Sequence, residues 1–142
     1  MAITFENVIY DRVIDALHSL IVDEFSIPVY FDEHQGNQSF VLTPGEDTLS
    51  ERLSGGQNRS YSVELSYQLN SGGNYTKNGF KQVSNIGERM KRLIYNNSAY
   101  SPSGTYKWHD GNIETIEYSR DEDNPELLMA IMIFNCNSME SR

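Results

Sequence analysis

The feature that most constrains the fold is LLMAIMIF at residues 127–134, the most apolar run in a chain of 142 residues. Eight apolar residues are too few for a membrane-spanning helix, which needs about 18 or more. As a β-strand, the run is apolar on both faces, because successive side chains point to opposite sides. One face would carry Leu127, Met129, Ile131 and Ile133, and the other Leu128, Ala130, Met132 and Phe134. A strand of this kind needs cover on both faces.

A second strand shows why that cover is hard to find within one chain. The segment SYSVELSYQL at 60–69 alternates strictly between polar and apolar residues, so one face is buried and the other is wet. This pattern is typical of an antiparallel sheet with helices on one side only. We therefore expect helices of the same chain to cover one face of 127–134 and another subunit to cover part of the other.

Two amphipathic helices are expected to provide the internal cover. Apolar residues recur at helical spacing over 5–24, where Thr4 is a suitable N-cap, and again over 80–95. Gly87 weakens the second helix by up to about 1 kcal/mol, unless it permits a close approach to a neighbouring element.

Four further strands are predicted. A hairpin is predicted from segments 27–33 and 38–44, and two strands at 105–109 and 112–120 are separated by an Asp-Gly turn. A closing hairpin follows, with its acidic turn at 121–125. The order predicts one α+β domain over residues 1–142, with a mainly antiparallel sheet of four to six strands and two helices packed on one face.

Two polar stretches are predicted to be loops. Residues 44–59 form a long connection whose only apolar side chains are Leu49 and Leu53, and NSGGNYTKNG at 70–79 is a second loop. Loops as long as the first are usually functional or disordered. Leu49 and Leu53 could serve as the anchors of an arm that reaches a neighbour, since a few apolar anchors carry most interface energy.

The charge balance excludes several classes of protein. Twenty acidic residues against 11 basic ones give a net charge of −9, which disfavours binding to nucleic acid or to an anionic membrane. A surface with this charge can lie next to DNA without binding it. Cys136 is the only cysteine, so neither an internal disulfide nor a Cys-rich zinc site is expected. The first residues lack the features of a signal peptide, which predicts a protein made and kept in the cytoplasm.

Three acidic segments are candidate chemical sites. Asp32, Glu33 and His34 are adjacent on a predicted strand and cannot all converge on one ion, so an exposed strand end is favoured over a metal site or an acid-dependent hydrolase. His109 and Asp110 lack a nucleophile motif beside them. The turn at 121–126 lacks the glycine and the ligand spacing of an EF-hand. We predict no catalytic site, no metal and no cofactor.

The layout resembles the tail terminator (tail completion) family of long-tailed bacteriophages, including its minor-tail and head–tail joining relatives. The resemblance covers nearly the whole chain and consists of the order of elements, with no single diagnostic motif. The elements are an N-terminal helix, a strand near IPVYFDE, a long loop, the strand YSVELSYQL, the helix FKQVSNIGERMKRLIYNN and the hairpin NIETIEYSRDEDNPELLMAIMIFNCN.

The resemblance implies a structural virion protein without catalysis. Such a protein forms a ring, typically a hexamer, on the end of the tail tube, ends its polymerisation and offers a docking surface to the head connector. DNA passes through the hole without specific binding, and assembly takes place in the host cytoplasm. The expected partners are therefore other copies of the chain, the tube protein and the connector protein, with no membrane.

We assign candidate residues to this reading and keep two alternatives. The subunit or tube interface is assigned to Leu49, Leu53, Trp108, Met132 and Phe134, and an acidic rim to Asp121, Glu122 and Asp123. The main alternative is a small α+β dimeric module that binds a ligand or has a regulatory role. The other is the hydrolase that would use residues 32–34.

Overall fold

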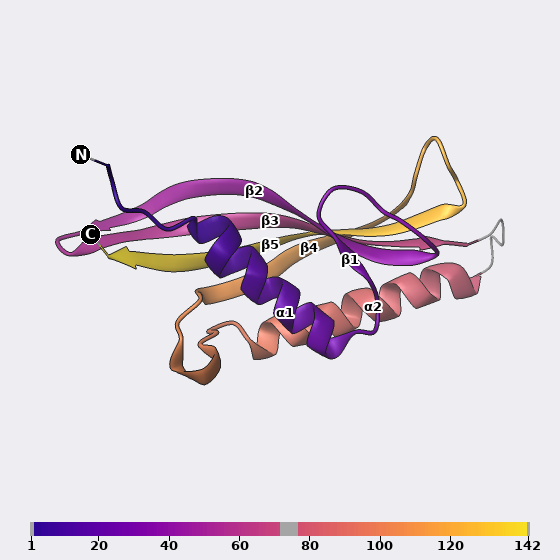
Figure 1. The fold of residues 1–142 in the computed structure, drawn as a ribbon. Helices are drawn as coiled ribbons and strands as arrows, with labels where there is room; N and C mark the ends of the chain where they lie inside the picture. The colour runs from indigo at the N-terminus through magenta and orange to yellow at the C-terminus, as the bar shows by residue number, and fades with distance from the viewer. Residues whose placement is uncertain (1, 72–76, 142) are drawn as a thin grey trace.

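The computed structural model describes residues 2–71 and 77–141 and consists of one sheet with helices on one face (Figure 1). The strands are β1 (Val29–Tyr30), β2 (Gln38–Leu53), β3 (Gly56–Asn70), β4 (His109–Arg120) and β5 (Leu127–Ser141). The helices are the π-helix η1 (Val8–Ile14), which continues into α1 (Asp15–Glu24), then α2 (Lys77–Asn96) and the short 3₁₀ helix η2 (Pro102–Gly104). The predicted α+β class is confirmed.

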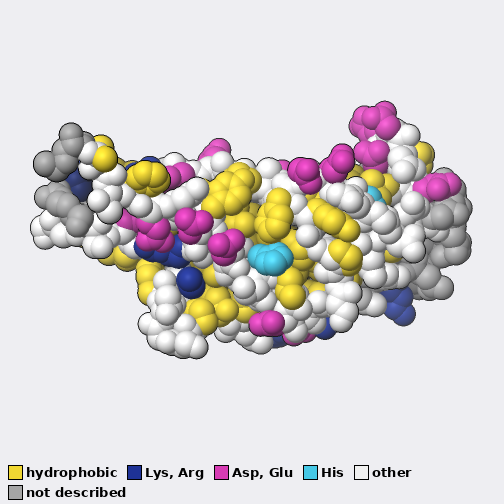
Figure 2. Space-filling model, viewed as in Figure 1, with side chains coloured by type: hydrophobic (Ala, Val, Ile, Leu, Met, Phe, Trp, Pro, Cys, Tyr) yellow, Lys and Arg dark blue, Asp and Glu magenta, His cyan; other side chains and the backbone are white. Residues whose placement is uncertain are grey.

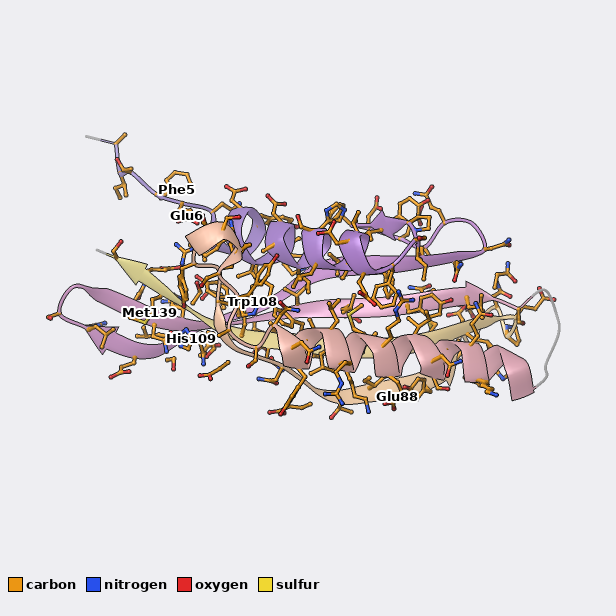
Figure 3. All side chains as sticks on the ribbon, turned by 90° about the horizontal axis from the view of Figure 1, so that it is seen from below. Phe5, Glu6, Glu88, Trp108, His109 and Met139 are labelled. Carbon is orange, nitrogen blue, oxygen red and sulfur yellow. The ribbon has the colours of Figure 1, made fainter. Side chains whose placement is uncertain are left out.

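The sheet has the order β1-β2-β3-β5-β4 and is antiparallel except for the β1–β2 pair. η1 and α1 lie over the β2 side of the sheet, and α2 lies over β5 and β4 (Figures 1 and 3). Both helices therefore cover the same face, as predicted. We call this the helix-covered face and the opposite one the open face.

The core fills the space between the helices and the sheet, and β3 shows how the sequence places it. Tyr61, Val63, Leu65 and Tyr67 are buried and point toward the helices, which confirms the alternation predicted for this strand. Phe40 from β2 lies beside Tyr67, with ring centroids 5.4 Å apart.

Gly87 does permit a close approach between α2 and β4. A Cβ atom on this residue would lie 2.5 Å from the hydroxyl oxygen of Tyr118, which leaves no room for a larger side chain without movement of the tyrosine. The cost of a glycine inside a helix is thus offset by tight packing of the helix on the sheet.

The first helix begins later than predicted. Thr4 does not cap it; instead the Asn7 side chain accepts a hydrogen bond from the Tyr10 backbone N–H at 3.4 Å. Phe5 consequently lies outside the helix and is 83% exposed. Asn is a stronger N-cap than Thr, and Asn7 stands three residues after Thr4, so the helix begins after Asn7. Phe5 matches the helical spacing by chance.

The first predicted hairpin is wrong. β1 is only two residues long and pairs with β2 in parallel, with Val29 opposite Phe40. The segment 31–37 carries the chain back before β2 starts, and Gly36 adopts a left-handed conformation there (φ +75°). The Phe40 N–H adds a bond to the Pro28 carbonyl, at 2.9 Å, and Val29 packs against the core.

The predicted loop at 44–59 is also wrong, because most of it is a long hairpin. β2 and β3 run on as paired strands to a two-residue turn at 54–55, with Leu53 opposite Gly56. This outer part of the hairpin lies beyond the ends of the helices (Figure 1). Its side chains are largely exposed on both faces, so its sequence lacks the alternation that reveals a half-buried strand. The loop predicted at 70–79 lies partly at 72–76, outside the described residues.

The Asp-Gly turn predicted between residues 109 and 112 is a bulge within a single strand. β4 runs through it, with a register shift between His109 and Asn112 and a positive φ of 54° at Asp110. The Gly111 N–H donates to the Ser98 carbonyl at 2.8 Å, which ties the bulge to the segment after α2. The closing hairpin of β4 and β5 is present as predicted.

Cys136 gives a direct test of the packing on the helix-covered face. The thiol is buried, and burial raises its pKa to about 12. We expect iodoacetamide at pH 8 to label it at least about 100-fold more slowly in the folded protein than in denaturant, because only the thiolate reacts. Mass spectrometry of the alkylated chain measures both rates. Equal rates would show that β5 is not packed as described.

Candidate functional site: the open face and the edges of the sheet

The open face of β5 is the part of the sheet that its own chain leaves uncovered. Ile133 is 43% exposed, and Met129 and Ile131 are partly exposed, whereas the alternate residues of the strand are buried under the helices. This confirms that one face of the closing strand is covered internally, whereas the other is covered only in part within the described residues. Its neighbours in the register are polar, with Glu64 opposite Ile133 and Ser66 opposite Ile131.

Polar side chains form a hydrogen-bonded row across the same face. The Ser60 hydroxyl donates to the Asn137 side-chain oxygen at 2.6 Å, and the Asn137 amide donates to the Asp110 carboxylate at 3.3 Å. The row joins β3, β5 and β4. Because these groups bond to one another, they offer a polar surface with little demand for an outside partner.

The strands place charged side chains of only one sign on the open face. The five strands contain three basic residues, Arg52, Arg59 and Arg120, and all three lie on the helix-covered face. Arg59 forms an ion pair with Asp47 at 2.6 Å there, and Arg120 lies 5.0 Å from the centre of the Phe80 ring of α2.

Four acidic residues of the strands occupy the open face by register and contacts: Glu51, Glu64, Asp110 and Glu117. The strands therefore present carboxylates and no cation on this side. A surface of this kind repels a polyanion without offering it a site of attachment.

Both edges of the sheet have unpaired stretches among the described residues. β4 is the outer strand on one side, and on the other side β1 pairs with only Phe40 and Val41 of β2. Unpaired strand edges expose N–H and C=O groups that can pair with another chain. Both edges therefore leave backbone groups of the described strands available for pairing.

Three of the five assignments to the subunit or tube interface are wrong, because these residues belong to the core. Trp108, Met132 and Phe134 are fully buried in the single chain and cannot reach a neighbour. The Trp108 ring lies 5.0 Å from that of Phe134 and 4.9 Å from that of Tyr100, and its indole N–H donates to the Asn97 carbonyl at 3.0 Å. On β5, the outward positions are those of Met129, Ile131 and Ile133.

The other two assigned interface residues lie on the projecting hairpin. Leu49 is 41% exposed, and Leu53 is partly exposed beside the turn. Leu53 also lines a shallow hollow of about 510 Å³ together with Tyr106 and Met139. Both leucines are available to a partner, and their role at an interface stays a prediction.

The glycines of the hairpin turn test whether the hairpin is paired to its end. A Cβ atom on Gly56 would lie 2.1 Å from the Glu140 carbonyl oxygen, whereas one on Gly55 would meet nothing within 4 Å. We expect Gly56→Ala to lose about 1–3 kcal/mol of stability at this end of the sheet, as overpacking typically does. Amide hydrogen exchange of residues 50–60 measures the loss. Gly55→Ala is the matched control, and equal protection in both variants would contradict the pairing.

The acidic turn after β4 protrudes from the sheet (Figures 1 and 2). Glu122 and Asp123 are exposed, and Asp121 uses one carboxylate oxygen to accept the Asn124 backbone N–H at 3.0 Å. The described residues contain no group of three or more His, Cys, Asp or Glu side chains placed to hold a metal ion. The assignment of Asp121, Glu122 and Asp123 to an acidic rim stays a prediction.

Residues 32–34 do not form a convergent site. Asp32 accepts the backbone N–H of Glu33 at 2.9 Å, while the His34 ring lies 2.6 Å from the Ser39 hydroxyl. Burial lowers the pKa of His34, so the ring is neutral near pH 7. Ser39 is fully buried and cannot meet a substrate, which leaves a structural bond between the loop and β2.

The N-terminal segment is a feature that sequence reasoning missed. Arg12 binds the Glu6 carboxylate through two hydrogen bonds, at 2.8 and 3.1 Å, which raises the pKa of Arg12 and lowers that of Glu6. The same guanidinium donates to the Ser138 hydroxyl at 2.8 Å and to the Met139 carbonyl at 2.7 Å. Arg12 therefore fixes the base of the segment to the end of β5.

A groove of about 930 Å³ runs between α2 and β4, on the far side of the helix layer from α1. Lys91, Arg92 and Tyr95 line it from the helix, and Asn112 and Ile113 line it from the strand. Tyr95 is 75% exposed, which is high for a large aromatic side chain. No local sequence pattern identifies this groove, because it arises from the docking of α2 against an edge strand.

Comparisons with known proteins do not place this chain in a family: no protein-family model and no curated protein matches the sequence. Among the described residues, no helix is both long enough and apolar enough to span a membrane. The fold and surface define an α+β domain with an anionic sheet face that is covered only in part, and with unpaired stretches at two edges.

Proposed function

We propose that the protein is a structural component of a phage particle, a ring-forming tail terminator without catalytic activity. In this role it caps the head-proximal end of the tail tube, ends its polymerisation and joins it to the head connector. Several copies, typically six, surround a hole through which DNA passes.

The observation that carries the proposal is the charge of the open face. DNA that slides past a wall needs a surface without phosphate-binding groups, and the strands direct Arg52, Arg59 and Arg120 away from this face. Glu64 and Glu117 place carboxylates next to hydroxyl and amide groups on this face. Such a surface repels the phosphates of DNA weakly and offers them no cation.

The edges and the half-exposed apolar residues of β5 give the proposal further support. A subunit with two different open edges can bind the next copy head to tail, and such contacts close into a ring when the rotation between copies allows it. Met129, Ile131 and Ile133 share the open face with Glu64 and Glu117, so in such a ring they line the hole, where apolar side chains offer phosphates no partner.

Imaging of the purified chain tests this proposal. We expect light scattering to detect a species of several times 16.2 kDa at high protein concentration. We expect negative-stain microscopy to show rings with a central hole, either free or bound to the ends of tail tubes. A protein that stays monomeric or dimeric under all these conditions, and that does not bind the ends of tail tubes, would contradict it.

The groove between α2 and β4 favours the alternative of a dimeric module that binds a ligand or has a regulatory role. Its volume is enough for a small molecule, and Arg92 would suit an anionic one, since Lys91 is paired with Glu88 of the same groove at 2.9 Å. A thermal-shift screen with small organic anions separates the two functions. A ligand that binds tightly to a stable dimer would favour the module over the tail terminator.

A further inference from the structure

The two edges of the helix layer have opposite charges. η1 and α1, on the β2 side, contain four acidic residues and only Arg12, which is bound to Glu6. α2, on the β4 side, contains five basic residues and one acidic residue, Glu88. Arg89 pairs with Glu24 of α1 at 2.8 Å and Lys91 pairs with Glu88 at 2.9 Å, which leaves a smaller excess of positive charge at the outer edge of α2. Asp11 and Asp15 are exposed at one edge, and Lys91 and Arg92 are exposed at the other. Two copies placed side by side would therefore attract each other across this layer.

The same two edges carry matching apolar features. Ile3 and Phe5 are 85% and 83% exposed at the α1 edge, the highest values for large apolar side chains among the described residues. They are separated by one residue, so an extended segment directs both to the same side. The α2–β4 groove, with Tyr95 and Ile113 in its walls, lies at the opposite edge.

Arg12 makes this segment suitable as a docking element. It holds Glu6 with two hydrogen bonds and anchors itself on β5 through Ser138 and Met139. Because the base of the segment is fixed, less conformational entropy is lost when its outer residues bind. A fixed base also limits the directions in which Phe5, labelled in Figure 3, can project.

We propose that the N-terminal segment of one copy, residues 2–7, docks into the α2–β4 groove of the next copy, with Ile3 and Phe5 in the groove. Asp11 and Asp15 of the first copy then face Lys91 and Arg92 of the second. The inference rests on the proposed ring and names the contact between its subunits. Because donor and acceptor are different surfaces at opposite edges, the contact is head to tail and repeats around a closed ring.

A cysteine pair tests the contact directly. The variant Phe5→Cys/Tyr95→Cys is made in a Cys136→Ser background and oxidised at rising protein concentration. We expect a ladder of disulfide-linked species on a non-reducing gel that ends at the ring number. Each single-cysteine variant is the control and yields at most a two-copy product.

A charge swap tests the same contact without cross-linking. Asp15→Arg and Arg92→Asp should each reduce the ring fraction at least tenfold in light scattering, and the combined Asp15→Arg/Arg92→Asp variant should restore it. Both positions are exposed, so the melting temperatures should stay close to that of the wild type.

The outcomes separate this inference from the proposed function. Rings that form normally in both single charge variants, with no ladder from the cysteine pair, would overturn the contact and leave the ring proposal standing. A product that stops at two copies would indicate a two-fold contact and would also overturn it. A chain that forms neither rings nor cross-links would overturn both.

Discussion

Trp108→Ala is expected to lower the free energy of unfolding by about 3–5 kcal/mol, the range for truncation of a large buried aromatic residue. The side chain is fully buried and packs between Tyr100 and Phe134, with ring centroids 4.9 and 5.0 Å away. Its indole N–H also satisfies the Asn97 carbonyl at the end of α2. The variant loses packing and leaves that carbonyl without its donor.

Urea or thermal unfolding followed by circular dichroism measures this effect. Phe5→Ala is the matched control, because it also truncates an aromatic residue but at a site that is 83% exposed. At a protein concentration too low for association, we expect it to change stability by less than about 0.5 kcal/mol. The opposite pattern, a stable Trp108→Ala variant that no longer associates, would show that Trp108 lies at the subunit interface after all.

The assignment of Trp108, Met132 and Phe134 to a seam shows where sequence reasoning stopped. The alternation of 127–134 correctly predicted two apolar faces and an uncovered one, because a period of two follows from strand geometry alone. It could not tell which face the helices would take. The helices cover the face with Phe134, and the outward face keeps the aliphatic residues Ile131 and Ile133.

The projecting hairpin was missed for a different reason. Strands are detected in a sequence by the contrast between a buried and an exposed face, and residues 45–52 have no buried face. Their pairing depends on backbone hydrogen bonds with β3 and on contacts such as that of Arg59 with Asp47. Such interactions leave no periodic pattern in the sequence.

The N-terminal segment and its groove depend on contacts between residues far apart in the chain. Arg12 and Ser138 are 126 positions apart, and nothing near either one predicts that they meet. The opposite charges of the two helices were visible in the sequence. The sequence does not show that the two helices lie at opposite edges of the sheet, because their positions follow from the strand order.

Reversal of charge on the open face is expected to create DNA binding where the wild type has none. Glu64 and Glu117 are exposed and lie opposite Ile133 and Ile131 in the register, so they flank the apolar residues of β5 from both sides. In Glu64→Lys/Glu117→Lys each copy changes by four charges, and up to two phosphate contacts become available. Each contact contributes a slope of about −0.9 in a plot of log affinity against log salt.

Fluorescence anisotropy with a labelled duplex at low and physiological salt measures the gain. Asp32→Lys/Glu33→Lys is the matched control, because it adds the same charge at an exposed loop. If the open face lines a channel, only the first variant should bind DNA strongly once rings have formed, since a ring places its lysines around one duplex. Equal binding by the two variants would show that net charge alone governs the effect, and DNA binding by the wild type would contradict the role of the open face as a non-adhesive wall.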